Sequence, residues 1–214
     1  KKFSKDYQAG LFSFEFNFMG EKVITNSGYF QDYKHQLNII SKSSAAHSTL
    51  ILNNTSSAKF ERNNNGHMLV SKNFKILDKE IKKEKNFWFI KASHDAYVKS
   101  NGVTHERQLS YTHNQFKLEG CEKLIKNKNF KSSNFEIRFH LLPYINLTKL
   151  LNNQSILIES KNAGWKFTCE DYKIDIETGL YFGNKNKYYE NKNILITGLT
   201  TPNEQNIFWE ILKI

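Results

Sequence analysis

The sequence of 214 residues lacks the features that indicate a cross-linked, metal-clustered or membrane-spanning protein. Its two cysteines, Cys121 and Cys169, are far apart and form no Cys-x-x-Cys pair, which argues against a disulfide framework and against a zinc knuckle. No run of about 18 apolar residues predicts a membrane-spanning helix. The sequence also begins without an initiator Met or a recognisable signal peptide, so we expect it to be a piece of a longer protein.

Arginine is scarce although the chain is strongly basic. The formal charge is +10, yet only three of the 31 basic residues are arginines: Arg62, Arg107 and Arg138. A basic chain suggests a polyanionic partner, either nucleic acid or an acidic polysaccharide. Phosphate and sulfate sites favour Arg, whose planar fork makes two hydrogen bonds, and the Lys and Asn excess is also what an AT-rich genome produces. We therefore expect no nucleic-acid partner.

Apolar and polar residues alternate with a period of two along much of the chain, which is typical of strands with one buried face. The clearest segments are LFSFEFNF (11–18), NFEIRFHL (134–141) and GWKFTCED (164–171). The C-terminal IFWEILKI (207–214) is apolar on both faces and predicts a fully buried strand. We expect six aromatic side chains to be mostly buried: Phe12, Phe14, Phe16, Trp165, Phe167 and Trp209.

Helix and linker signals are few. No helical period lasts three turns, and the best helix candidate is INLTKLL (145–151). There are only two prolines, no internal repeat and no Pro- or Gly-rich linker, while turn signals recur about every 10 to 20 residues. The sequence thus predicts an all-β fold: an antiparallel β-sandwich of about a dozen or more strands, with few or no helices, in a single domain spanning 1–214.

Histidines are the main candidates for catalytic or metal-binding residues. None of the seven lies at HxH or HExxH spacing, so there is no local zinc signature. His47 stands among small residues just before the apolar run Leu50–Leu52. A metal ligand, a catalytic base and a packed structural histidine all remain open for it.

A second group lies in the predicted strand 103–111, where His105 and Arg107 share one face and Glu106 takes the other. Two groups that can carry positive charge could bind a carboxylate or sulfate. The alternative is a cross-strand charge pair on a solvated sheet face. His140, near Arg138, is expected at the surface, and His94 is expected to make local hydrogen bonds in a turn.

The order of the segments resembles the C-terminal β-sandwich domain of the heparinase II/III-like polysaccharide lyases. The matching pieces cover most of the chain: LFSFEF (11–16), VITNSGYF (23–30), SSAAHSTLILNNTSSAKF (43–60), ASHDAYVKSNGVTHERQLSY (92–111), FEIRFHLLP (135–143) and GWKFTCED (164–171). The resemblance implies a further N-terminal α-helical toroid that supplies a catalytic tyrosine. It also implies β-elimination on uronate-containing polysaccharides, in a bacterial protein of the periplasm or cell envelope.

The resemblance also implies a metal site, which this sequence departs from. The family's HxH pair falls on Asp6 and Gln8, its metal-binding Asp falls on Asn26, and its last ligand survives as His47. One imidazole with two neutral amides makes a poor zinc site. We therefore expect the zinc site to be degraded and predict no cofactor.

These observations lead to one main functional hypothesis and one alternative. The first is a lyase domain that needs its own N-terminal toroid, is inactive in isolation, and has an acidic polysaccharide as partner but neither nucleic acid nor membrane. The alternative is a non-catalytic carbohydrate-binding or structural sandwich. No catalytic residue is identified; the predicted cleft residues are His47, Asn26, Gln8, His105 and Arg107. We expect the first three to meet where strands beginning at Leu11, ending at Asn26 and beginning at Thr49 lie side by side.

Overall fold

The computed structural model describes residues 6–71, 74–151, 153–184 and 186–214. Across these residues there are sixteen strands, and every pair of neighbouring strands runs antiparallel. Helix is confined to four short pieces: α1 (Gln36–Lys42), η1 (Ser44–Ala46), α2 (Val98–Asn101) and η2 (His113–Gln115). The predicted all-β class with few helices is confirmed. No helix in the described ranges is long and apolar enough to cross a membrane.

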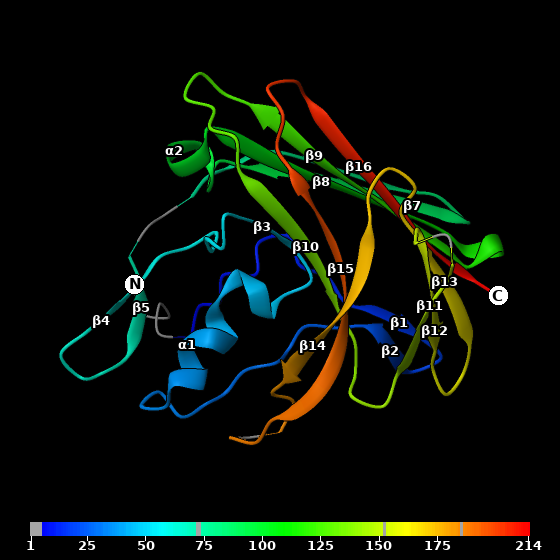
Figure 1. The fold of residues 1–214 in the computed structure, drawn as a ribbon, viewed down its shortest axis with the longest axis horizontal. Coiled ribbons are helices and arrows are strands. Elements are labelled where there is room, and N and C mark those ends of the chain that lie inside the picture. Colours follow the sequence, from blue (N-terminus) through cyan, green and yellow to red (C-terminus); the bar gives the residue numbers. More distant parts are fainter. Residues whose placement is uncertain (1–5, 72–73, 152, 185) are drawn as a thin grey trace.

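Two sheets form the sandwich (Figure 1). The larger sheet has eight strands in the order β11-β12-β13-β16-β9-β8-β7-β6: β6 (Ile76–Lys83), β7 (Phe87–His94), β8 (Val103–Thr112), β9 (Lys117–Lys126), β11 (Asn146–Lys149), β12 (Ser155–Glu159), β13 (Gly164–Thr168) and β16 (Gln205–Lys213). The smaller sheet has four strands in the order β14-β15-β10-β3: β3 (Leu50–Leu52), β10 (Asn134–His140), β14 (Ile174–Tyr181) and β15 (Tyr189–Leu199). Two hairpins complete the fold, β1 (Phe16–Phe18) with β2 (Glu21–Ile24) and β4 (Phe60–Arg62) with β5 (Met68–Val70).

The core lies between the two sheets and is rich in aromatic rings. The ring of Phe139, on β10, lies 4.8 Å from that of Phe167 and 4.8 Å from that of Trp209, measured between centroids. Burial of one such side chain stabilises the fold by about 1.5–3 kcal/mol. Of the six aromatic residues expected to be buried, Phe16, Trp165, Phe167 and Trp209 are buried, whereas Phe12 and Phe14 are half-buried.

The segment 11–18 corrects the first strand prediction. Only Phe16–Phe18 is a strand, and Phe12 adopts a left-handed backbone with φ of 56°. The alternation of apolar residues in this segment therefore does not reflect a continuous strand. The turn at Phe12 directs its carbonyl group toward the interior, where Arg107 donates a hydrogen bond to it.

Two further segments differ from expectation. The helix candidate 145–151 contains strand β11, which pairs with β12; a segment this short gains more from the sheet ladder than from an isolated helical turn. The C-terminal strand is buried on one face only. Ile207, Trp209 and Ile211 point into the core, but Phe208 is 57% exposed because nothing in the described chain covers the outer face of the larger sheet there.

Candidate functional site

Three of the predicted site residues meet at one end of the smaller sheet. Oε1 of Gln8 lies 3.0 Å from Nε2 of His47, although the two residues are 39 positions apart. Asn26 accepts a hydrogen bond from the backbone N–H of Ser48, the residue after His47. The predicted proximity is confirmed, and so is the expectation that His47 bonds a neighbour.

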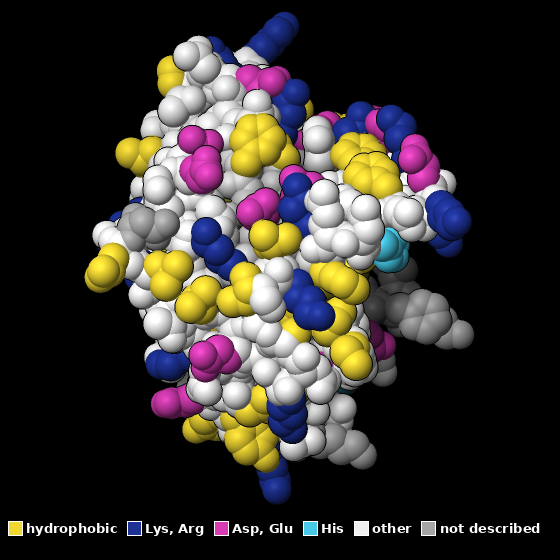
Figure 2. Space-filling model, turned by 90° about the vertical axis from the view of Figure 1, so that its right-hand side faces the viewer, with side chains coloured by type: hydrophobic (Ala, Val, Ile, Leu, Met, Phe, Trp, Pro, Cys, Tyr) yellow, Lys and Arg dark blue, Asp and Glu magenta, His cyan; other side chains and the backbone are white. Residues whose placement is uncertain are grey.

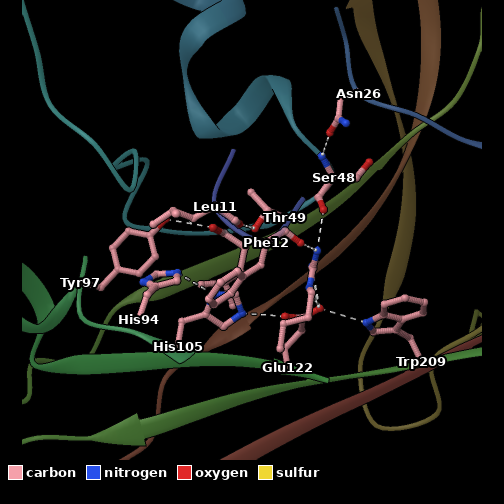
Figure 3. A network of polar contacts seen from close by, with 12 residues as sticks. Leu11, Phe12, Asn26, Ser48, Thr49, His94, Tyr97, His105, Glu122 and Trp209 are labelled. Carbon is pink, nitrogen blue, oxygen red and sulfur yellow. Dashed lines mark hydrogen bonds and ion pairs between the residues drawn. The ribbon is translucent and has the colours of Figure 1, made fainter. Parts of the chain in front are cut away.

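Loops rather than three adjacent strands produce this meeting. His47 follows η1, Asn26 follows β2, and Gln8 lies in an irregular segment before the turn at Phe12. The hydroxyl of Thr49 donates to the carbonyl of Leu11 at 2.6 Å and so ties the segment after Gln8 to the segment after His47 (Figure 3). The prediction of side-by-side strands at Leu11 and Asn26 was therefore wrong in detail.

The two nitrogens of the His47 ring have different partners. Nδ1 lies 2.8 Å from the carbonyl of Ser43, which can only accept, so Nδ1 carries a proton. Burial lowers the pKa of His47, which keeps the ring neutral near pH 7 and leaves a lone pair on Nε2. Gln8 can meet that lone pair by turning its amide so that NH₂ faces the ring. Nε2 of His47 is therefore held only by a side chain that can rotate away.

Gly10 lets the backbone cover the His47 ring. A Cβ atom at Gly10 would lie 2.5 Å from Cδ2 of His47 and 2.8 Å from its Cγ, closer than real Cβ contacts. The absence of a side chain at Gly10 is thus required for the N-terminal segment to lie against the ring. His47 is buried as a result, with 6% of its surface exposed.

The residues present do not fit the zinc site that the family resemblance implies. Asn26 already bonds the Ser48 N–H, and both side-chain partners of the site, Asn26 and Gln8, are neutral amides. Within the described residues no group of three or more His, Cys, Asp or Glu side chains could hold a metal ion.

His105 and Arg107 lie inside the sandwich, not on a solvated face. As predicted, they share one face of β8, and there both contact the fully buried Glu122 of β9. Nε of Arg107 and Nε2 of His105 each lie 2.7 Å from the carboxylate, and Nε1 of Trp209 donates to it at 3.2 Å. The predicted cross-strand charge pair is present, between Arg107 of β8 and Glu122 of β9, but it is buried and not solvated. The positive charge of Arg107 is therefore already balanced within the protein.

The proton positions in this buried cluster follow from its hydrogen bonds (Figure 3). The N–H of Ala96 donates to Nδ1 of His94, so a neutral His94 carries its proton on Nε2 and donates to Nδ1 of His105 at 3.2 Å. His105 then donates from Nε2 to Glu122. Burial, together with the nearby positive charge of Arg107, lowers the pKa of His94 to about 2. The expected local hydrogen bond of His94 is confirmed.

Glu122 is ionised at the centre of this cluster. Burial alone would raise its pKa, but the charge of Arg107 and the hydrogen bond from His105 outweigh burial and hold the pKa at about 2. Arg107 also donates to the carbonyls of Ser48 at 2.6 Å and Phe12 at 2.9 Å. The buried cluster therefore fixes the two backbone segments that carry His47 and Gln8.

His140 was expected at the surface and is instead buried. Its Nε2 donates to the carbonyl of Ala45 and its Nδ1 accepts from the hydroxyl of Ser27. Burial is the main cause that lowers its pKa to about 3. The prediction failed because η1 and the segment after β2 cover the polar face of β10, which no local pattern reveals.

Sequence reasoning also missed Glu122, although a signal for it exists. In β9 the inward positions are Leu118, Gly120, Glu122 and Leu124, so an acid stands in an apolar period-two series. Such a position indicates a buried carboxylate that needs a cationic partner. His94 and Ser48 carried no comparable signal, because their roles depend on contacts between distant segments.

The basic residues are dispersed over the face of the molecule shown in Figure 2. Among the described side chains on the face shown in Figure 2, Lys and Arg alternate with acidic and hydrophobic groups rather than forming one patch. Several lysines are also paired locally, as Lys91 is with Asp78 and Glu80. A high net charge therefore does not translate into a single basic surface on that face.

Known proteins resemble this chain in fold and in family. The family model for the heparinase II/III-like C-terminal domain matches residues 1–210. The heparan sulfate lyase HepC from Pedobacter heparinus superposes with a TM-score of 0.76 at 13% identity, covering 96% of this chain and 30% of that one. The heparinase III BT4657 gene product gives a TM-score of 0.73 at 14% identity, with 96% and 30% covered.

A further heparinase III structure gives a TM-score of 0.70 at 14% identity, covering 97% of this chain and 30% of that one. The chain thus spans about 30% of the length of these structures. A search of curated protein sequences finds no match. At such low identity the structures support the fold, while the family assignment rests on the family model. Because that model covers residues 1–210 of 214, the chain belongs to the heparinase II/III-like C-terminal family.

Proposed function

We propose that this chain is the β-sandwich part of a polysaccharide lyase that cleaves uronate-containing polysaccharides by β-elimination, and that His47 contacts the substrate. One observation carries the role of His47. Among the described buried histidines, His94, His105 and His140 have both ring nitrogens bonded to backbone, hydroxyl, carboxylate or imidazole groups, whereas Nε2 of His47 faces only the Gln8 amide.

The chemistry of β-elimination assigns a task to such a nitrogen. The reaction needs a base for the proton α to the carboxylate, neutralisation of the carboxylate charge, and an acid for the leaving oxygen. A neutral imidazole with a lone pair on Nε2 can accept a sugar hydroxyl hydrogen bond or a proton once Gln8 rotates away. The remaining groups would come from an α-toroid, as the family resemblance implies.

The nature of the substrate is supported by the relatives. HepC is described as a heparan sulfate lyase, and heparan sulfate is a glycosaminoglycan that contains uronic acid. We therefore propose an acidic polysaccharide as the substrate class and as the main partner. The sandwich by itself is expected to be inactive.

The test uses the full-length protein that contains this chain, incubated with a panel of uronate polysaccharides. A lyase releases unsaturated uronate ends, which are followed by their ultraviolet absorbance. We expect product from at least one polymer, and we expect His47→Ala to lower kcat/KM by about 10²–10⁴-fold.

The matched control is His113→Ala, because His113 is exposed in η2 and takes no part in the site. It should leave kcat/KM unchanged, and both variants should keep the wild-type circular dichroism spectrum. Full activity in His47→Ala would exclude His47 as a substrate contact. Absence of product from every polymer would exclude the lyase.

A second function is favoured by the replaced ligands. Asp6, Gln8 and Asn26 stand where the family resemblance expects a catalytic histidine and stronger metal ligands. A non-catalytic carbohydrate-binding sandwich would tolerate these replacements. It would retain acidic glycans on a column and release no unsaturated uronate.

A further inference from the structure

An open cleft lined by three tyrosines lies at the end of β14 and β15, apart from His47. It has a volume of about 490 Å³ and is lined by Tyr144, Tyr181, Tyr189 and Asn184, together with Leu142 and Pro143. Tyr144 and Tyr189 are 47% and 45% exposed. Exposed aromatic rings that gather in a hollow are more typical of a binding surface than of a solvated one.

Two of the tyrosines are placed by the sheet itself. Tyr181 and Tyr189 are directly opposite in the β14–β15 ladder, so their side chains project from the same face of the sheet. Gly183 allows the chain to lie against Tyr181, because a Cβ at Gly183 would come within 2.2 Å of that ring. Asn184 donates a hydrogen bond to the Tyr189 hydroxyl at 3.5 Å. Backbone pairing and local contacts thus position both rings before any ligand binds.

The third ring, Tyr144, is held by charged neighbours. The carboxylate of Glu21, which accepts the backbone N–H groups of Lys161 and Asn162 at 3.1 Å each, lies close to the Tyr144 hydroxyl. The ammonium group of Lys161 lies 4.5 Å from the centroid of the Tyr144 ring. The cleft therefore combines a fixed aromatic surface with a cation at its border.

This combination matches a charged sugar. The C–H groups on one side of a pyranose ring form an apolar, electropositive surface that packs on the negative face of an aromatic ring. Tyrosine hydroxyls and the Asn184 amide can bond sugar hydroxyls, and a lysine can pair with a carboxylate or sulfate. A purely apolar ligand would leave these polar groups without partners.

A short chain of backbone contacts connects the residues beside the cleft to those beside His47. Gly28 bridges Phe182, the residue before Gly183, and the N–H of Phe182 donates to the carbonyl of Ser27. The N–H of Ser27 in turn donates to the carbonyl of Ala46, next to His47. These hydrogen bonds fix the position of the cleft relative to His47.

We propose that the tyrosine cleft binds a sugar unit of an acidic polysaccharide and extends the His47 site. This inference rests on the proposed function for its substrate class. The cleft is a binding subsite, so its loss should weaken the binding of long substrates while the rate of the chemical step stays the same.

The test measures binding of size-defined heparan sulfate oligosaccharides, and of a neutral oligosaccharide, to the full-length protein by calorimetry. We expect Tyr144→Ala with Tyr189→Ala to raise the Kd of a long acidic oligosaccharide about tenfold or more, as the loss of two ring contacts predicts. Lys161→Gln should weaken binding of the acidic ligand and leave the neutral one unchanged. In the lyase assay the double variant should raise KM and keep kcat.

Tyr188→Ala is the matched control, because Tyr188 is 55% exposed, adjoins Tyr189 in sequence and does not line the cleft. It should change the Kd less than about twofold. Circular dichroism and the Tm show whether each variant is folded.

Unchanged binding in a folded double variant, or an equal loss in Tyr188→Ala, would overturn the subsite while a lyase activity still stood. Binding of the neutral ligand alone, lost in the double variant, would overturn the acidic substrate class. Failure of the protein to bind or cleave any acidic polymer would overturn both the subsite and the proposed function.

Discussion

The two polar clusters of the sandwich differ in how their histidine rings are held. In the buried cluster, which comprises His94, His105, Arg107 and Glu122, each nitrogen of the two imidazole rings has a partner held by the backbone or by a neighbouring strand. The second cluster comprises His47, Gln8 and Asn26 and is called the His47 cluster. There, one nitrogen of His47 is fixed by the Ser43 carbonyl and the other faces the Gln8 side chain. A fully satisfied network gives rigidity, whereas a partly mobile one leaves a group free to react.

The two clusters are also connected. Arg107 balances the charge of Glu122 and, with the same guanidinium group, holds the carbonyls of Ser48 and Phe12. The charge that stabilises the interior thus positions the loop that carries His47. Substitutions in the buried cluster should therefore mainly lower the free energy of unfolding, and substitutions in the His47 cluster should mainly change ligand binding.

The largest effect is expected from Glu122→Gln. The substitution keeps the shape of the side chain but leaves Arg107 as an uncompensated buried charge, which costs about 3–5 kcal/mol of unfolding free energy. Urea denaturation measures it. Glu177→Gln is the control, since Glu177 pairs with Arg138 in a partly exposed setting and should cost about 1 kcal/mol or less. Equal losses of unfolding free energy in the two variants would mean that the buried ion pair stabilises the fold no more than the partly exposed one.

Acid should destabilise the protein through its buried histidines. Burial lowers the pKa of His140 to about 3 and that of His94 to about 2, whereas unfolded histidine titrates near about 6.5. The unfolded chain therefore binds protons first, so the contribution is present above about pH 6.5 and is lost as the pH falls toward the folded values. In that window each histidine changes the free energy of unfolding by about 1.4 kcal/mol per pH unit, so the two together change it by about 3 kcal/mol per pH unit.

The measurement is the unfolding free energy at pH 5.5 and 4.5. His140→Gln should reduce the slope by about 1.4 kcal/mol per pH unit, and His113→Gln, on the exposed η2 turn, should leave it unchanged. A slope that does not depend on His140 would show that this ring is protonated in the folded state.

Zinc binding tests whether the His47 cluster can hold a metal ion. We predict that the wild-type chain shows no zinc-dependent rise in Tm. Gln8→His with Asn26→Asp would restore charged and imidazole donors beside His47, and a new site would stabilise the fold by about 2.7 kcal/mol at a zinc concentration 100 times its Kd. The same pair with His47→Ala should lose that gain. A zinc-dependent shift in the wild type would show that the amides do bind metal.

The smallest effect is expected from Gly10→Ala. The new methyl group would meet the His47 ring, and such overpacking costs about 1–3 kcal/mol. The shifted ring should also change the NMR chemical shift of its Nε2, while the His105 signals stay in place. Gly20→Ala is a poor control because of its positive φ, so Asn17→Ala, which is exposed on the nearby strand β1, serves instead. A shift in His105 comparable to that in His47 would mean that the clusters do not behave separately.

Local sequence determined the strands whose apolar residues alternate without interruption. The series Phe135, Ile137 and Phe139 and the pair Trp165 and Phe167 predicted β10 and β13, since a sheet buries every second side chain. The same rule failed at 11–18, where the alternation is present but the backbone turns at Phe12. Periodicity reports which side chains are apolar, and it does not report whether a partner strand is available.

Sequence alone thus predicted the sandwich class and, through the family resemblance, the proximity of His47 to Gln8 and Asn26. Only the tertiary structure decided which polar residues are buried. His140 lies on a polar face of β10, and it is buried because η1 covers it and supplies a hydrogen-bond partner. His105 and Arg107 are buried because the neighbouring strand β9 supplies Glu122 as their common partner. The physical reason is that burial of a polar group depends on whether a partner compensates its lost hydration, and those partners lie from 11 to 113 positions away.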